Sequence, residues 1–449
     1  MQGDRTKILV ESIKRLLRRN AVIHLQKIVN KTHAADLSVV FPSLPLSNQH
    51  RLFDMIADVQ QKGVLFSELD ENTLLNFTEN IELDEFVEIL ENMASDDVAD
   101  LIGRLPEEKA AAVLEKMEKG SEEVEGLLRY KDDTAGGIMV PDFIALKQNT
   151  TARGAIESLQ TEHSDVEMPF YLYVVDEYGK LVGVCSLRQL VVVPPETPLK
   201  EFMSTDVFSV QTDTDQEEVA KLVARYDILA VPVVNRTNVL EGIVTVDDVI
   251  DIFRAEATED FLKMAGVSGE EFIETKSVIK SMRIRLPWLF ASCVGGIFAF
   301  FVIGQFEESL TRFTYLAAFI PVIMGMGGNI GTQSSTIVVR GLATGLLDIR
   351  DIWSVVFKEL AVGFILGIVY GTLIAVVAQF QYNLVAVAAS VALAVLCSMS
   401  VAALVGSLVP MLFARINIDP AVATGPFVTT SIDIISVFFY FKIATTFLE

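Results

Sequence analysis

The sequence predicts a multidomain fold, with an all-α N-terminal domain, an α+β tandem repeat and an α transmembrane domain of five helices. Three observations support this prediction. Hydrophobic residues make up 51% of the 449 residues, and many lie in long uncharged runs in the C-terminal third. A unit of about 60 residues occurs twice in the middle of the chain. Short segments with helical periodicity fill the part before it.

Residues 1–130 are predicted to form a small helical domain. Apolar residues recur there at spacings of three and four, as at Phe86, Ile89 and Leu90, and this spacing places them on one side of a helix. Pro, Asn and Asp residues separate these stretches. We therefore expect several short helices around a common core.

The repeat follows. The motifs at 174–176 and 183–186 recur 59 residues later at 233–235 and 242–245. Each unit alternates β-branched strands with a helix and contains a Gly-x-x-Ser/Thr signature. The two units resemble a tandem pair of CBS domains, at 131–202 and 203–258. Residues 259–285 are then predicted to form an amphipathic connecting helix that couples the two halves of the chain, with a passive linker as the alternative.

The five predicted spans cover about 286–306, 313–340, 356–378, 384–412 and 420–446. A hydrocarbon core roughly 30 Å thick needs about 20 helical residues, so each segment is long enough. Basic residues precede the first span, separate the second from the third and precede the fifth. The positive-inside rule therefore places the N-terminal region in the cytoplasm.

Charge indicates the kind of partner. The first 284 residues hold 51 acidic and 29 basic side chains, a formal charge of −22. Such a surface attracts cations and repels nucleic acid, so we expect no nucleic-acid partner. The four histidines lack zinc-ligand spacing, which favours a metal bound by oxygen. We find no nucleophile motif or phosphate-binding loop in the sequence, so an enzyme is not expected.

Asp433 is the single formal charge between Pro420 and Phe441 in the fifth span. A carboxylate in the middle of a membrane costs several kcal/mol unless it faces water, a partner or an ion. We therefore interpret Asp433 as a candidate ion ligand. The alternative is a protonated or paired acid that joins helices.

Glycines crowd the second span between Pro321 and Gln333. This composition predicts an irregular backbone with exposed carbonyls, which membranes tolerate only next to a cavity or inside protein. Asn329, Thr332 and Gln333 are therefore candidate pore-lining residues. Close helix packing is the alternative explanation of the glycines.

Acidic residues of the N-terminal region form two candidate cation sites. Asp96 and Asp100 are one helical turn apart and share a face. A second group stands at the end of the second repeat and the start of the connecting segment, and comprises Asp248, Asp251, Glu256 and Glu259. A hard cation would relieve the repulsion within each group. The alternative is a solvated acidic surface.

The order of these parts resembles the MgtE family of magnesium channels over essentially the whole chain. The most specific motifs lie at 134–139, 246–260, 327–329 and 419–433. The resemblance implies a homodimer in the lipid bilayer of the plasma (inner) membrane, with one pore lined by the second and fifth spans. It implies Mg²⁺ as both the transported and the regulatory ion. Asp433 would face the pore, and Asp419 would lie at its cytoplasmic mouth.

The resemblance also implies a set of regulatory ligands through which cytosolic Mg²⁺ closes the pore. Carried over by position, they are Asp96, Asp100, Asp215, Glu217, Asp227, Asp248, Asp251, Glu256, Glu259 and the carbonyl of Gly137. ATP is a further ligand that the CBS pair could take. The first repeat departs from nucleotide-binding CBS domains, because Gln189 stands where the second repeat has Asp248. An ion-coupled divalent metal carrier is the alternative function.

Overall fold

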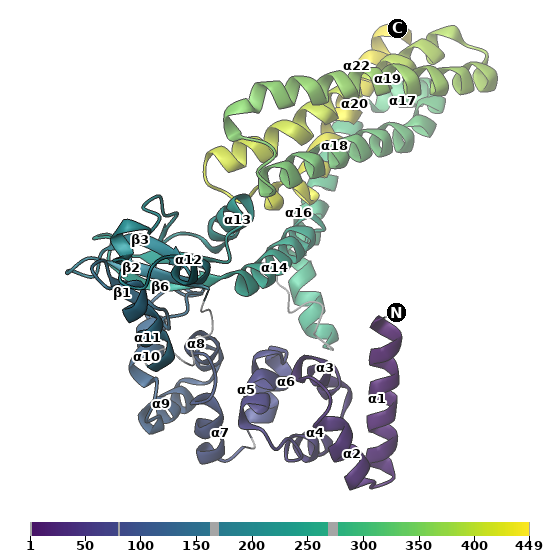
Figure 1. The fold of residues 1–449 in the computed structure, drawn as a ribbon. Helices are drawn as coiled ribbons and strands as arrows, with labels where there is room; N and C mark the ends of the chain where they lie inside the picture. The colour runs from purple at the N-terminus through teal and green to yellow at the C-terminus, as the bar shows by residue number, and fades with distance from the viewer. Residues whose placement is uncertain (1, 80, 162–169, 268–276, 449) are drawn as a thin grey trace. The chain divides into compact units, whose positions relative to one another are not determined.

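The computed structural model describes residues 2–79, 81–161, 170–267 and 277–448 (Figure 1). The chain divides into two compact units, Met1–Ile252 and Phe253–Glu449, which are described separately.

The N-terminal part of the first unit is entirely helical within the described residues, which confirms the predicted all-α domain. Its helices are α1 (Gln2–Arg18), α2 (Val22–Val29), α3 (Ala34–Ser38), α4 (Leu46–Phe53), α5 (Val59–Ser67), α6 (Glu71–Thr78), α7 (Leu83–Leu90), α8 (Ser95–Gly103), α9 (Glu107–Lys116) and α10 (Ser121–Leu127). Stacked aromatic rings fill its core, with the centroids of Phe53 and Phe66 5.1 Å apart. The side chains of Asp58 and Asp70 cap α5 and α6, and such caps define where short helices begin.

Two three-stranded sheets follow, and their matching topology confirms the repeat. The first repeat comprises β1 (Ala145–Lys147), α11 (Ala152–Thr161), β2 (Tyr171–Val175), β3 (Leu181–Ser186) and α12 (Leu187–Val192). The second comprises β4 (Val210–Gln211), α13 (Gln216–Tyr226), β5 (Ala230–Val234), β6 (Leu240–Thr245) and α14 (Val246–Met264). In each sheet the first strand pairs parallel to the second, and the second pairs antiparallel to the third. Tyr173, Ala230 and Ile243 pack together in a core shared by the two repeats.

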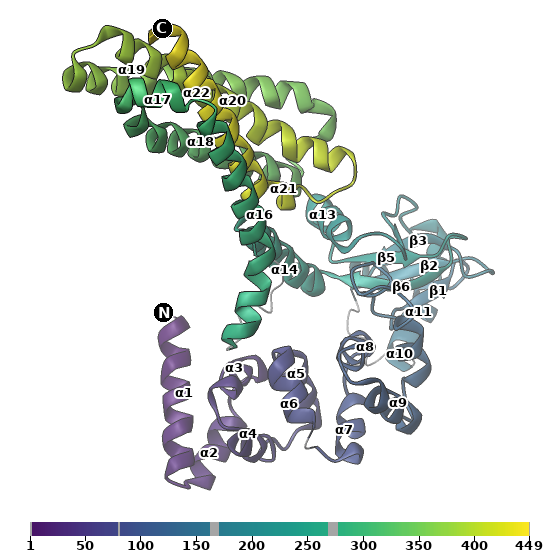
Figure 2. The same cartoon turned by 180° about the vertical axis from the view of Figure 1, so that it is seen from behind.

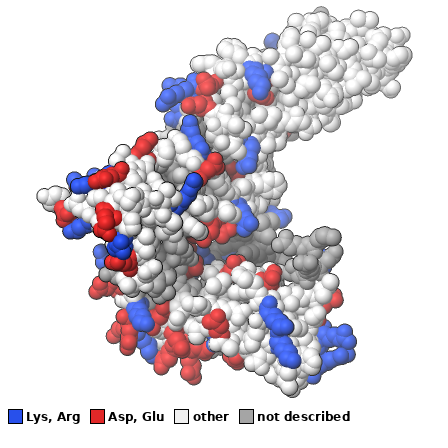
Figure 3. Space-filling view, in the orientation of Figure 1, with Lys and Arg blue, Asp and Glu red and all other residues white. Residues whose placement is uncertain are grey.

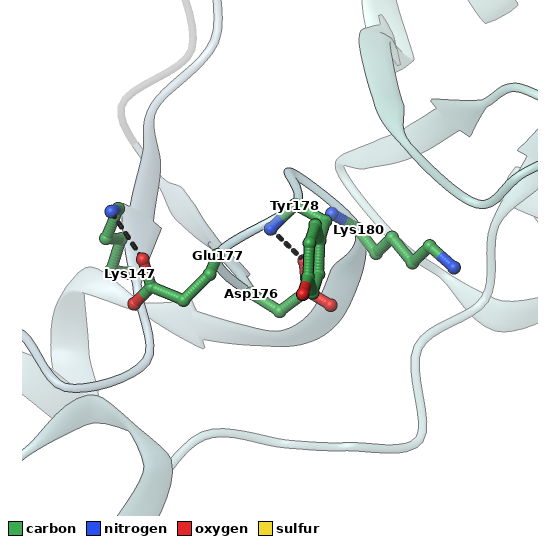
Figure 4. A network of polar contacts seen from close by, with 5 residues as sticks. All are labelled: Lys147, Asp176, Glu177, Tyr178 and Lys180. Atoms are coloured by element: carbon green, nitrogen blue, oxygen red, sulfur yellow. Dashed lines mark hydrogen bonds and ion pairs between the residues drawn. The ribbon is translucent and has the colours of Figure 1, made fainter.

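The turn between β2 and β3 shows an acid with a structural role. Asp176 Oδ1 accepts hydrogen bonds from the backbone N–H of Tyr178 and Lys180, at 2.8 and 2.9 Å (Figure 4). Asn235 does the same in the second repeat for Thr237, at 2.9 Å. Beside this turn, Lys147 pairs with Glu177 at 2.7 Å.

The connecting helix expected over 259–285 falls partly outside the described residues, which leave out 268–276. Its first residues complete α14, which begins in the second repeat, and its last residues begin α16 (Val278–Gly304). Gly266 explains where α14 ends. It has φ +73°, and the N–H groups of Gly266 and Val267 donate back to the carbonyls of Lys263 and Leu262, the pattern of a glycine-terminated helix.

Among its described residues, the second unit contains five helices that are long and apolar enough to span a membrane, as predicted. They are α16, α18 (Ile320–Ala343), α19 (Ile352–Tyr382), α20 (Val385–Arg415) and α22 (Pro426–Leu448). The short α17 (Glu307–Arg312) and a 3-10 turn (Thr314–Phe319) join the first two. The expected fifth span over 420–446 is broken at Gly425, so that α21 (Pro420–Thr424) is separate from α22.

Close helix packing holds this unit together. α19 runs beside α20 in both views (Figures 1 and 2). Gly363, Gly367 and Gly371 recur every four residues on α19, and a Cβ at any of them would lie within 3.0 Å of α20. Small residues at this spacing let two backbones approach closely in a membrane.

Candidate pore and metal sites

A polar strip on α18 is the first candidate site. Asn329, Thr332 and Gln333 lie three and four residues apart and are all exposed in the single chain, whereas Ile330 and Ser334 beside them are buried. Polar side chains on the outer face of a spanning helix are costly in lipid. This face therefore fits a water-filled path or a protein interface better than lipid.

The glycines of α18 do not have the role predicted for them. The segment is a continuous α-helix, so the expectation of an irregular backbone with exposed carbonyls is wrong. A Cβ at Gly327 would lie 2.7 Å from Ser398 Oγ and 2.8 Å from Ser436 Oγ. Gly331 lies directly against Gly406 of α20. The glycines permit close helix packing, which was the alternative explanation.

Asp433 is half-buried on α22 and lies beside α18. Its Oδ1 is 4.0 Å from the position that a Cβ would take on Gly328, next to the polar strip. Among the described residues, none of the ion pairs involves Asp433. The structure thus places Asp433 against the helix that carries the polar strip, and ion binding by Asp433 stays a prediction.

Asp419 lies at the start of α21. Its Oδ1 accepts a hydrogen bond from the N–H of Ala421 at 2.8 Å and so caps that short helix. Its Oδ2 lies 2.6 Å from Lys263 Nζ, and the same ammonium lies 2.6 Å from Glu259 Oε1. The structure thus brings two predicted ligands together, but through a lysine that the sequence analysis did not single out.

In the N-terminal domain, Asp96 and Asp100 both lie on α8, as their spacing predicted. Asp100 is accessible at the surface, yet its carboxyl is partly withdrawn from water, and this burial raises its pKa. Arg104 counteracts the rise and Asp132 adds to it. Asp132 is therefore a neighbouring acid that the sequence analysis missed, because it stands 32 positions further along the chain.

Three of the residues implied as metal ligands have structural roles on α13. Asp215 caps its first turn by accepting from the N–H of Glu217 at 2.8 Å. Glu217 pairs with Lys221 at 2.9 Å. Asp227 ends the helix in the left-handed conformation, with φ +53°. These contacts alone account for acids at these positions, so metal binding there stays a prediction.

The acids of α14 are spread along the helix. The side chain of Asp248 accepts a hydrogen bond from Thr245 Oγ1, while Asp251 is exposed and Glu256 is half-buried. Gly137 lies so close to the backbone of Lys131 and Asp132 that no side chain fits there. Within the part of the chain that the structure describes, no three His, Cys, Asp or Glu side chains form a metal site by themselves.

The surface charge is uneven. The face seen in Figure 3 shows acidic side chains gathered over the N-terminal helices and few charged side chains over the spanning helices. Acids in the first turns of α7, α9 and α10 contribute to this surface, namely Asp84, Glu85, Glu107, Glu108, Glu122 and Glu123. Carboxylates in these positions stabilise the helices through the helix dipole and also draw cations to the surface.

A small cavity of about 100 Å³ lies in the CBS pair. Its lining includes the rings of Tyr171, Tyr173 and Phe208, together with Asp206 and Pro232. The hydroxyl of Tyr173 is buried and has no hydrogen-bond partner among the described residues. Aromatic walls and an unsatisfied hydroxyl suit a flat heteroaromatic ring that can hydrogen-bond.

The fold and these sites define a multi-pass membrane protein whose spanning helices carry a carboxylate beside a polar strip and whose first unit contains a tandem CBS pair. Family models match a divalent cation transporter domain at 320–443, an MgtE intracellular N domain at 32–133 and CBS domains at 135–196 and 199–255. The chain belongs to the MgtE family.

Two relatives cover almost all of the chain. It is 33% identical to the magnesium transporter MgtE of Bacillus subtilis, over 97% of this chain and 96% of the relative. It is 34% identical to the magnesium transporter MgtE of Thermus thermophilus, over 98% of this chain and 99% of the relative. These relatives are magnesium transporters and not enzymes.

Among the solved structures that the chain resembles is one from the same family. The crystal structure of the cytosolic domain of the Mg²⁺ channel MgtE in complex with ATP is 33% identical, with a TM-score of 0.52. The match covers 54% of this chain and 99% of the solved chain.

Proposed function

We propose that this protein is a magnesium-selective channel that admits Mg²⁺ down its electrochemical gradient. The observation that carries the proposal is Asp433, a carboxylate in a spanning helix that lies beside the polar strip of Asn329, Thr332 and Gln333. A divalent ion crossing about 100 mV gains roughly 2 × 2.3 kcal/mol, so influx needs no other energy source.

The pore lies in a homodimer in this proposal. In one chain the polar strip of α18 is exposed, and a second copy facing it would enclose this strip and bring two Asp433 carboxylates to one path. Mg²⁺ dehydrates reluctantly and keeps several waters. Two carboxylates holding the hydrated ion through water suit that preference. Asn329, Thr332 and Gln333 would line the path beside them.

Cytosolic Mg²⁺ closes the pore in this proposal. The regulatory ligands are Asp96, Asp100, Asp215, Glu217, Asp227, Asp248, Asp251, Glu256, Glu259 and the carbonyl of Gly137, while Asp419 is a Mg²⁺ ligand at the cytoplasmic mouth of the pore. Because Mg²⁺ usually takes only one or two carboxylates and fills its other positions with water, it does not need three acids already gathered. When Mg²⁺ is scarce, the like charges repel and the closed arrangement loses its ties.

The protein lies in the plasma (inner) membrane with its N-terminal region in the cytoplasm, as the basic residues beside the spans indicate. ATP binds the CBS pair. The aromatic cavity with the unpartnered Tyr173 hydroxyl supports this, together with the ATP complex of the similar cytosolic domain.

Flux into proteoliposomes tests the transport proposal against an ion-coupled carrier. Purified protein is reconstituted, and Mg²⁺ entry is followed with an enclosed indicator while the membrane potential and the proton and sodium gradients are set independently. The channel predicts entry that follows the potential alone. Asp433→Asn should abolish it, while Ser431→Ala, two residues away on α22, should not. Entry that requires a proton or sodium gradient would favour the carrier.

A further inference from the structure

Three charged side chains meet where the end of α14 contacts α21. Lys263 bridges Glu259, one turn earlier on its own helix, and Asp419, 156 positions further along the chain, with both N–O distances at 2.6 Å. The side chain of Lys263 is 21% exposed and that of Asp419 is 34% exposed. The ammonium group of Lys263 therefore links α14 to α21 at a place that is only partly exposed to solvent.

The backbone around this bridge is closely packed. A Cβ on Gly266 would lie 3.2 Å from Pro426 Cδ, and one on Gly425 would lie 3.5 Å from the carbonyl oxygen of Lys263. The bridge is thus part of a packed contact between the end of α14 and the start of α22. It does not depend on two long side chains alone.

Both oxygens of Asp419 are engaged. One accepts from the N–H of Ala421 and the other from Lys263. Burial by itself would lower the pKa of Lys263, but the hydrogen bonds to Asp419 and Glu259 outweigh this and raise it overall. The lysine is accordingly a permanent cation at neutral pH.

We propose that Lys263 is a tethered cation that holds Glu259 and Asp419 together without metal, and that Mg²⁺ must displace it to bind Asp419. Mg²⁺ binds carboxylate oxygen at about 2.0–2.1 Å, and two cations so close to one oxygen repel each other strongly. The lysine thus keeps α14 against α21 at low Mg²⁺ and weakens the apparent affinity of Asp419 for the metal. This inference rests on the proposed role of Asp419 as a Mg²⁺ ligand.

Zero-length cross-linking tests the bridge in the full-length wild-type protein. A carbodiimide activates the Asp419 carboxyl, the Lys263 amine attacks it to form an amide, and the original carboxyl oxygen leaves with the urea. Mass spectrometry should find this cross-link in EDTA, and millimolar Mg²⁺ should lower its yield severalfold. Lys147 and Glu177 are 2.7 Å apart, and neither is a proposed ligand. This pair provides the control, whose cross-linking yield should not change.

Two substitutions separate the outcomes. Modification of Asp419 by carbodiimide and an added amine is measured as Mg²⁺ rises. In Lys263→Met, protection of Asp419 should begin at roughly tenfold lower Mg²⁺, equivalent to about 1.4 kcal/mol, while Lys263→Arg should resemble the wild type. If Mg²⁺ protects Asp419 at the same concentration in wild type and Lys263→Met, Lys263 does not compete with Mg²⁺. Asp419 would then remain a ligand. Failure of the cross-link in EDTA would overturn the bridge, and no protection in any protein would overturn both proposals.

Discussion

Ser334 on α18 donates a hydrogen bond to Glu359 on α19, with Oγ and Oε2 2.8 Å apart. The two residues are 1% and 5% exposed, so the bond lies inside the membrane unit. Ser334 follows Gln333 directly. The bond therefore fixes the rotation of α18 and, with it, the direction of the polar strip.

Glu359→Ala should lower the thermal stability of the detergent-solubilised protein, because it leaves the buried Ser334 hydroxyl without its acceptor. A loss of about 1–3 kcal/mol is expected. Glu359→Gln keeps an acceptor and should lose less, and Lys358→Ala at the exposed neighbouring position should lose little. An equal melting temperature for Glu359→Ala and Lys358→Ala would contradict the assignment.

Gly406→Ala should separate α18 from α20, because its Cβ would press on the backbone of Gly331. Overpacking of this kind costs about 1–3 kcal/mol, and backbone yields less readily than a side chain. Gly296→Ala is the matched control, since a Cβ there meets nothing within 4 Å. Melting temperatures of the two variants decide the point, and a Gly406→Ala protein as stable as Gly296→Ala would refute the close contact.

Tyr173→Phe should have opposite effects with and without nucleotide. Removing an unsatisfied buried hydroxyl should raise stability without ATP by about 1 kcal/mol. The same change should reduce the stabilisation that ATP produces. Tyr178→Phe, at a position 82% exposed, should alter neither. Differential scanning fluorimetry with and without ATP measures both effects, and full ATP stabilisation of Tyr173→Phe would remove Tyr173 from the site.

Asp100 should make the stability of the first unit depend on pH in metal-free buffer. Burial raises its pKa above the ordinary 3.8, so the folded state binds this proton more tightly than the unfolded state does. The resulting stabilisation is present at low pH and is lost as pH rises through the raised pKa. Asp100→Asn should flatten this slope in thermal unfolding between pH 3 and about 7. An unchanged slope would show that other groups cause it.

Periodic patterns predicted most of the fold. The helical N-terminal domain, the repeat and the five spans follow from apolar spacing, from Gly-x-x-Ser/Thr motifs and from uncharged runs, and these are local properties. The helicity of the 321–333 segment was not predicted, because neighbouring helices decide whether glycines bend a helix or let it pack. Gly266 could have indicated the end of α14, since glycine commonly follows a helix.

The site was predicted less completely. Asp433 is conspicuous because a charge stands alone in an apolar run. The pairing of Lys263 with Asp419 and that of Ser334 with Glu359 join residues 156 and 25 positions apart, and periodicity carries no information about such contacts. On α13 the sequence shows the acids but cannot show that Asp215 and Asp227 also define the ends of the helix.

Single-channel recording of the purified protein in a planar bilayer tests the central claim most directly. Mg²⁺ on the cytosolic side is stepped from zero to millimolar concentrations, with Asp433→Ala recorded alongside. The account predicts openings that become rare as cytosolic Mg²⁺ rises, and lost Mg²⁺ conduction or selectivity in the variant. Silent bilayers from protein that still takes up Mg²⁺ slowly with a proton gradient, or unchanged conduction in Asp433→Ala, would contradict it.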